Sequence, residues 1–185
     1  MLTFKNKPNK FHVDKRGKFF WESRSCAVEI NLFAIYKSEI YILIEKRSTT
    51  MMDCPNLWAI PSGYLDYDES GWEAAMREVY EETGLDITKY KDSIVENNYE
   101  DVFHVITHPS HNRQNVILEY CVILDFDKSG QKFPIELEEY KNKEIDKIQW
   151  LNMRELDHNK YEWAFNHNER IQNAFNKFKK HFLFI

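Results

Sequence analysis

Three glutamates lie within five residues near the middle of the chain: Glu78, Glu81 and Glu82 in the stretch "REVYEETGL". On a helix of 3.6 residues per turn their side chains project within an arc of about 100°, and like charges three and four residues apart repel each other. A cation bound among them would turn this repulsion into attraction. Oxygen ligands suit a hard ion such as Mg²⁺ or Mn²⁺, which also binds substrate phosphate. The alternative is a solvated acidic helix surface.

The helix that must carry these glutamates has clear ends in the sequence. "SGWE" at residues 70–73 has the Ser-x-x-Glu form of a capping box, and Gly84 is a typical helix stop. Between them an apolar stripe recurs at i, i+3, i+4 and i+7, formed by Trp72, Ala75, Met76 and Val79. We therefore expect one side of the helix to face a core and an adjoining side to display carboxylates.

The other elements are mainly strands. "CAVEINLFAIY" and "IYILIEKRS" are β-rich runs joined by the hairpin turn "KSE", and "NLWAIPSGYLD" is an extended, turn-rich segment. Further strands are expected in "SIVENNYEDVFHVI", "NVILEYCVILDF" and "KEIDKIQWLNMREL". Residues 158–185 show apolar residues at helical spacing and predict a long amphipathic helix that packs on the domain, or forms a homodimer interface. The pattern indicates a mixed α/β sandwich.

Length and composition are consistent with one domain over residues 1–185, with a core at about 24–157. The 185 residues are 43% hydrophobic, and the net charge of −5 does not favour a general nucleic-acid binder. Cys26, Cys54 and Cys121 match no metal-ligand spacing and predict reduced thiols. No apolar run resembles a signal peptide or is long enough to cross a bilayer, so a cytoplasmic protein is expected.

Residues on both sides of the three glutamates belong to a longer sequence motif. The segment from Gly63 to Leu85 resembles the Nudix box at every specified position, namely Gly63, Glu69, Arg77, Glu78, Val79, Glu81, Glu82, Gly84 and Leu85. "NLWAIPSG" is similar to the Trp-x-x-Pro-Gly-Gly approach of that family, with Ser62 where glycine is more usual. The resemblance implies the Nudix fold, a mixed β-sheet sandwiched between α-helices, here with the extra long C-terminal helix.

The resemblance also implies an activity and its residues. Nudix proteins typically use Mg²⁺ or Mn²⁺ to hydrolyse a nucleoside diphosphate linked to another moiety. The implied metal ligands are the three box glutamates, the Gly63 carbonyl and Glu144, which precedes the Trp150 strand end as in a late family segment. Arg77 would pair with Glu69 and hold the loop onto the helix. The general base is Glu78, Glu81 or Glu144, with Glu138 and Glu139 close by.

Substrate-binding candidates lie at the ends of the expected strands. Arg47 and Arg24 could contact phosphate, and Trp58 and Phe103 could stack on a base. Each has a structural alternative, as a surface ion pair or a core aromatic. His104, His108 and His111 lack a Cys or acidic partner at ligand spacing, so a transition-metal site is not favoured.

Several substrates and two other classes stay open at this point. A small nucleotide is favoured, and a 5′-triphosphorylated RNA end is the alternative, because the spacing of Glu144 and Trp150 resembles that of RNA pyrophosphohydrolases. A nucleotide-sensing Nudix domain without turnover and an isopentenyl diphosphate isomerase are the rivals. The complete box disfavours the former, and the pattern around Cys54 does not match the latter.

Overall fold

The central strand of the fold is β3 (Cys26–Tyr36), which turns tightly into β4 (Glu39–Arg47). The computed structural model describes residues 9–95, 98–108, 115–134, 137, 143–157 and 160–182. Lys37 and Ser38 have φ values of 52° and 56°, as expected for a two-residue turn that follows the twist of a hairpin. The predicted hairpin is therefore confirmed.

A mixed sheet is built around this hairpin. The strand order is β5 (Trp58–Ala59), β4, β3, β8 (Val116–Asp125) and β7 (His104–Ile106). The pairing of β3 with β8 is parallel and the other pairings are antiparallel. β9 (Ile145–Asn152) pairs with β4, so the predicted strands at residues 116–125 and 145–152 are confirmed.

One edge of β3 is shared by two strands. β4 pairs with its second half, from Phe33 to Tyr36, while β6 (Ser62–Tyr64) pairs with its first half, from Ala27 to Glu29. β4 has therefore separated from β3 where β6 begins. This divergence leaves room between the two strands, and the cavity described below lies there.

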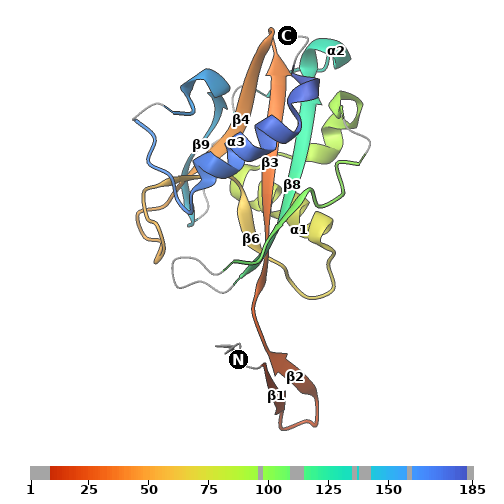
Figure 1. The fold of residues 1–185 in the computed structure, drawn as a ribbon, viewed down its shortest axis with the longest axis vertical. Coiled ribbons are helices and arrows are strands. Elements are labelled where there is room, and N and C mark those ends of the chain that lie inside the picture. The colour runs from red at the N-terminus through yellow and green to blue at the C-terminus, as the bar shows by residue number, and fades with distance from the viewer. Residues whose placement is uncertain are drawn as a thin grey trace, which may run out of the picture.

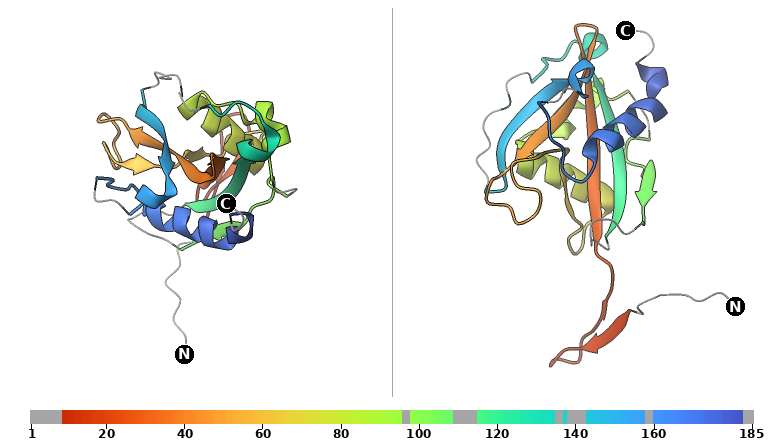
Figure 2. Two further views of the ribbon diagram at one scale, coloured as in Figure 1. Left: turned by 90° about the horizontal axis from the view of Figure 1, so that it is seen from above. Right: turned by 60° about the vertical axis from the view of Figure 1, so that its left-hand side comes forward.

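Helices cover both faces of the sheet, as predicted. α1 (Gly71–Thr83) lies behind the sheet and α3 (His167–Lys177) lies in front of it in Figure 1, and Figure 2 shows the three layers from above. Because side chains alternate along a strand, β3 sends Val28, Ile30 and Leu32 toward the α1 core. Phe33 and Ile35 belong to the core beneath α3. Short helical segments connect these layers: η1 (Ile87–Ser93), α2 (Phe126–Ser129), η2 (Met153–Glu155) and η3 (Lys179–His181).

Two sequence predictions are corrected. The C-terminal helix is shorter than residues 158–185, because the chain before His167 is extended beside β5: Trp58 N–H donates to the Glu162 carbonyl and Ala164 N–H to the Trp58 carbonyl, both at 2.8 Å. Asn166 (φ 59°) then starts α3. The strand expected in "SIVENNYEDVFHVI" is limited to β7, since Ser93 ends η1, Ile94 forms only an isolated bridge with Leu124, and residues 98–100 form a turn.

An N-terminal hairpin lies apart from the sheet and was not predicted. β1 (Lys10–Val13) and β2 (Phe19–Glu22) pair only with each other and project away from the domain in Figure 1. Phe11, Phe19 and Trp21 are exposed on it. In the described part of the chain, no helix is long and apolar enough to span a membrane.

Candidate active site

The helix that carries the three glutamates is held at both ends by the predicted caps. Ser70 Oγ accepts from Glu73 N–H at 3.3 Å, and the Glu73 carboxylate accepts from Ser70 N–H at 2.7 Å. Gly84 has φ 71° and donates its N–H to the Tyr80 carbonyl. Val79 is fully buried beneath the helix. The caps and the buried stripe together fix which side of α1 presents its carboxylates.

Strand β6 lies directly against the acidic side of α1. A Cβ atom added to Gly63 would be only 2.0 Å from Glu78 Oε1, so no larger residue is accommodated without displacing that carboxylate. The neighbouring Ser62 donates its backbone N–H to Glu82 Oε2 at 2.9 Å. Any residue other than proline supplies this donor, which explains why Ser62 is tolerated where the family pattern has glycine. Gly63 and the box glutamates thus face each other, as the resemblance implied.

Arg77 is the cation of this cluster. It donates to both oxygens of Glu69, at 2.8 and 3.0 Å, and to the Tyr64 carbonyl at 3.0 Å. The pairing with Glu69 was predicted. In addition, its Nη1 contacts Glu78 at 2.7 Å and Glu81 at 3.1 Å, so this side chain also reaches two of the box carboxylates.

Glu45 is a carboxylate of this site that the sequence analysis missed. It projects from β4 on the same face as Leu43, is 0% exposed, and lies beside Glu82. Burial raises the pKa of Glu45 to about 8. Burial, followed by repulsion from Glu45 and Glu78, raises the pKa of Glu82 well above its usual range. The sequence signal that could have revealed Glu45 is a charged residue at a core-facing position of the apolar strand "IYILIEKR".

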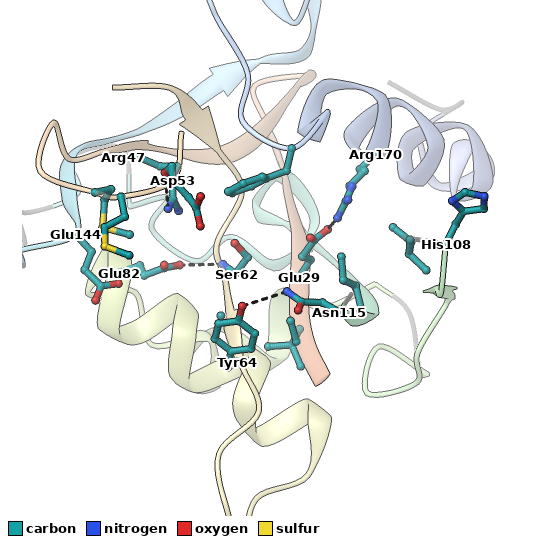
Figure 3. A pocket seen from close by; sticks show the side chains of 18 of the residues that line it. Glu29, Arg47, Asp53, Ser62, Tyr64, Glu82, His108, Asn115, Glu144 and Arg170 are labelled. Carbon is teal, nitrogen blue, oxygen red and sulfur yellow. Dashed lines mark hydrogen bonds and ion pairs between the residues drawn. The ribbon is translucent and has the colours of Figure 1, made fainter. Parts of the chain in front are cut away.

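The acidic cluster reaches a cavity of about 450 Å³ through Glu82, and this cavity is drawn in Figure 3. Gly63, Glu82 and Glu144 line one side of it. Glu144 therefore joins the box residues although it lies more than 60 positions later in the chain. Glu138 and Glu139, the other distant base candidates, lie outside the described residues, as does His111.

Two arginine side chains also line the cavity. Arg47 is 7% exposed, donates to the Asp53 carbonyl at 3.1 and 3.2 Å, and lies 5.1 Å from the centre of the Phe165 ring. Arg170, from α3, forms an ion pair with Glu29 and borders the same cavity, as Figure 3 shows. Sequence reasoning found Arg47 but missed Arg170, Phe165 and Glu29. The signal for Glu29 was again an acid within an apolar strand.

A buried histidine helps to hold Arg170 in place beside the cavity. His167 Nδ1 accepts from Ile60 N–H at 3.0 Å, which leaves Nε2 as the protonated nitrogen of the neutral ring. Nε2 lies 3.5 Å from Glu29 Oε1. Burial lowers the pKa of His167, and this favours the neutral ring. The contact orients Glu29, which in turn positions Arg170.

Three of the substrate-binding candidates do not line the cavity. Trp58 is buried and packs edge-on against Tyr161, with ring centres 5.5 Å apart. Phe103 packs against Phe178 at the same separation. Arg24 donates to the carbonyls of residues 107 and 115, at 2.7 and 2.8 Å. Trp58 and Phe103 thus pack against other aromatic side chains, as in their structural alternative, while Arg24 bonds to backbone carbonyls.

Among the described residues, His104 and His108 do not belong to any group of three potential metal ligands. His104 Nδ1 lies 2.5 Å from Glu119 Oε2, an acidic partner that comes from the adjacent strand β8. His108 is instead at the cavity wall.

The divalent ion implied by the resemblance can be tested against these donors. Within the described ranges, no three acidic, histidine or cysteine side chains surround a single ion position. The carboxylates of Glu78 and Glu81 instead contact the Arg77 guanidinium. The donor chemistry nevertheless fits: Glu45 has two buried oxygens without a hydrogen-bond donor, and Glu82 is next to it. Oxygen-only donors of this charge suit Mg²⁺ or Mn²⁺.

We expect the stability of the metal-free protein to fall as the pH rises. Because the folded-state pKa values of Glu45 and Glu82 lie above the unfolded value, the stabilisation is complete below about pH 4.5 and is lost as the pH rises through about 8. The slope should approach about 1.4 kcal/mol per pH unit for each carboxyl that stays protonated. Urea unfolding after EDTA treatment at pH 7.0, 7.5 and 8.0 measures it.

The chosen window separates this effect from histidine titration, because His167 is neutral in the folded and the unfolded chain above about pH 7. Saturating Mg²⁺ should flatten the slope, since a bound cation favours the ionised carboxylates. A metal-free protein with level stability across this window would contradict the raised pKa values.

Comparison with known proteins identifies the family. The NUDIX domain family model matches residues 29–173. The m7GpppN-mRNA hydrolase NUDT17 of Danio rerio is 31% identical over 68 residues, 36% of this chain and 23% of that protein. The RNA pyrophosphohydrolase of Bartonella bacilliformis is 29% identical over 111 residues, 59% of this chain and 65% of that protein. The chain thus spans less than two thirds of either curated relative.

A solved structure supports the same assignment at the level of the fold. The NUDIX domain of Shewanella oneidensis NrtR, solved with ADP ribose, has a TM-score of 0.63 at 15% identity, over 89% of this chain and 93% of that chain. The family match covers most of the chain, including the box helix and the cavity walls. The chain therefore belongs to the Nudix family.

Proposed function

We propose that this protein hydrolyses a pyrophosphate bond in a nucleoside diphosphate linked to another moiety, with Mg²⁺ or Mn²⁺ as cofactor. One observation carries the proposal: Glu82 of α1 and Glu144 border one cavity together with Arg47 and Arg170. Acidic side chains that can hold cations thus line the same cavity as basic side chains that can hold phosphate oxygens. This is the charge distribution that a metal-diphosphate substrate requires.

Each residue has a distinct role in this proposal. Glu82, Glu78, Glu81 and the Gly63 carbonyl hold the cation on the helix side, and Arg77 keeps the helix and its loop together. The cation, when bound, neutralises diphosphate oxygens and acidifies the attacking water. Arg47 and Arg170, which line the same cavity, orient the substrate, since guanidinium groups suit phosphate oxygens.

We assign the role of general base to Glu144. Of the three candidates, Glu144 is the one that lines the cavity among the described residues, whereas Glu78 and Glu81 contact Arg77, at 2.7 and 3.1 Å. Glu144 lines the cavity, so it can accept the proton of a water that attacks phosphorus there.

The favoured substrate is a small nucleotide. A cavity of about 450 Å³ is within the range of small-molecule sites. A second candidate is a 5′-phosphorylated or capped RNA end, which is favoured by the hydrolase names of the two curated relatives. Since the cavity opens to the surface beside Tyr64 and Asn115, the remainder of a longer substrate could extend outward.

A substrate panel tests the proposal. The purified protein is incubated with Mg²⁺ or Mn²⁺ and nucleoside triphosphates, nucleotide sugars, dinucleoside polyphosphates, ADP-ribose, and short triphosphorylated or capped RNA. We expect phosphate, pyrophosphate or a nucleoside monophosphate to be released from at least one class. Binding without release from any of them would favour a nucleotide sensor and overturn the hydrolase assignment.

A further inference from the structure

We propose that Glu45 on strand β4 is an additional ligand of the divalent cation, reaching the acidic helix from the sheet side. The inference rests on the proposed function, because the ion is the one assigned to the box glutamates. It adds a residue outside the Nudix box and outside the loop that contains Glu144. No feature of the box itself requires an acid at this position.

The burial of Glu45 is the first observation. The side chain is 0% exposed, and neither carboxylate oxygen has a hydrogen-bond donor among the described residues. An ionised carboxylate removed from water without a donor is strongly destabilising. The other side chain on this face of β4, Leu43, is part of the apolar core, so an aliphatic residue at position 45 would suit the fold better. The contacts within the folded chain therefore do not explain an acid at position 45, whereas a bound ligand would.

The position of Glu45 supplies the second observation. Its carboxyl lies beside Glu82 and is also near Glu78 and Glu144. These three residues belong to the helix and to the cavity wall. Glu45 therefore points into the acidic cluster, and it approaches from a direction that α1 cannot supply.

The nearby guanidinium groups make the hydrogen bonds described above with other partners, although the positive charge of Arg47 also acts on Glu45. Arg77 contacts Glu69, Glu78 and Glu81. The hydrogen bonds of the Arg47 guanidinium go to the Asp53 carbonyl. In the described part of the chain, two adjacent buried carboxyl groups are thus left without an ion pair. A divalent cation bound between them would supply the missing positive charge.

The test compares Glu45→Gln with wild type and with Glu162→Gln, an exposed glutamate away from the cavity. Mn²⁺ binding is measured by the electron paramagnetic resonance signal of free Mn²⁺, and Tm is measured with EDTA and with Mg²⁺. Glutamine has nearly the same shape but carries no charge. We expect Glu45→Gln to raise the Kd for Mn²⁺ at least about tenfold and to reduce the Mg²⁺-dependent increase in Tm.

The metal-free protein should respond in the opposite direction. With EDTA, Glu45→Gln should have a Tm equal to or above that of wild type, because a buried acid and its repulsion of Glu82 are removed. A purely structural role predicts a lower Tm instead. Glu45→Asp, which keeps the charge but shortens its reach, should give an intermediate Kd and provides a second variant if the glutamine protein does not fold.

The outcomes separate the two proposals. If wild type binds Mn²⁺ and hydrolyses a panel substrate while Glu45→Gln binds Mn²⁺ within twofold of wild type, only the Glu45 inference is overturned. If wild type neither binds Mn²⁺ nor hydrolyses any substrate, both proposals fail.

Discussion

Replacing Glu82 by glutamine should lower kcat by about 10³-fold or more while the protein stays folded. Glu82 is buried, and its Oε2 accepts from the Ser62 N–H at 2.9 Å. The carbonyl oxygen of a glutamine can accept the same hydrogen bond, so the link between α1 and β6 is retained. What is lost is the negative charge that holds the cation, and with it the activation of water and the neutralisation of the substrate.

The stability of the variant should confirm this interpretation. Because Glu82 lies next to Glu45 and Glu78, its neutral replacement relieves repulsion, and the Tm measured in EDTA should not fall. The assay is kcat on the best panel substrate, with Tm and Mn²⁺ affinity measured on the same preparations and Glu162→Gln as the control. Turnover close to wild type in the Glu82→Gln protein would remove Glu82 from the catalytic site.

Replacing Gly63 by alanine should lower turnover by about 10²-fold at a small cost in stability. Gly63 does not have a positive φ, so the backbone itself accepts alanine. The added methyl group would instead be 2.0 Å from Glu78 Oε1 and 2.2 Å from its carboxyl carbon. That side-chain end can move, which limits the stability loss, but the movement breaks the 2.7 Å contact with Arg77 and takes the carboxylate out of the site.

Gly130→Ala is the matched control for this prediction. Gly130 has φ 68° with nothing within 4 Å of an added Cβ, so alanine is strained there without any clash. It ends α2, far along the chain from the box. We expect Gly130→Ala to lose about 1 kcal/mol of stability with normal turnover, and Gly63→Ala to show the reverse pattern. An active Gly63→Ala protein would show that the contact between Gly63 and Glu78 is not needed for catalysis.

The helix of the Nudix box could be predicted almost completely from the sequence. Its caps, its buried stripe and the arc of its glutamates depend on residues three to four positions apart, and such local interactions are visible in a linear pattern. The β3–β4 turn is equally local, since Lys37 and Ser38 take the backbone conformation of a two-residue hairpin turn. The motif itself also led to Gly63, although the reason for the glycine, the contact with Glu78, is a tertiary one.

The remainder of the site depends on pairings between distant segments. Whether Glu45 faces α1 or solvent is decided by the pairing of β4 with β5 and β9 and by the packing of α1 on that face. Arg170 reaches the cavity because residues 160–165 run beside β5 and delay the start of α3. Periodicity within a segment reports which residues share a face, but it does not report what that face will meet. Long-range packing therefore brought Glu82 of the acidic helix and the distant Glu144 together with two guanidinium groups around one cavity.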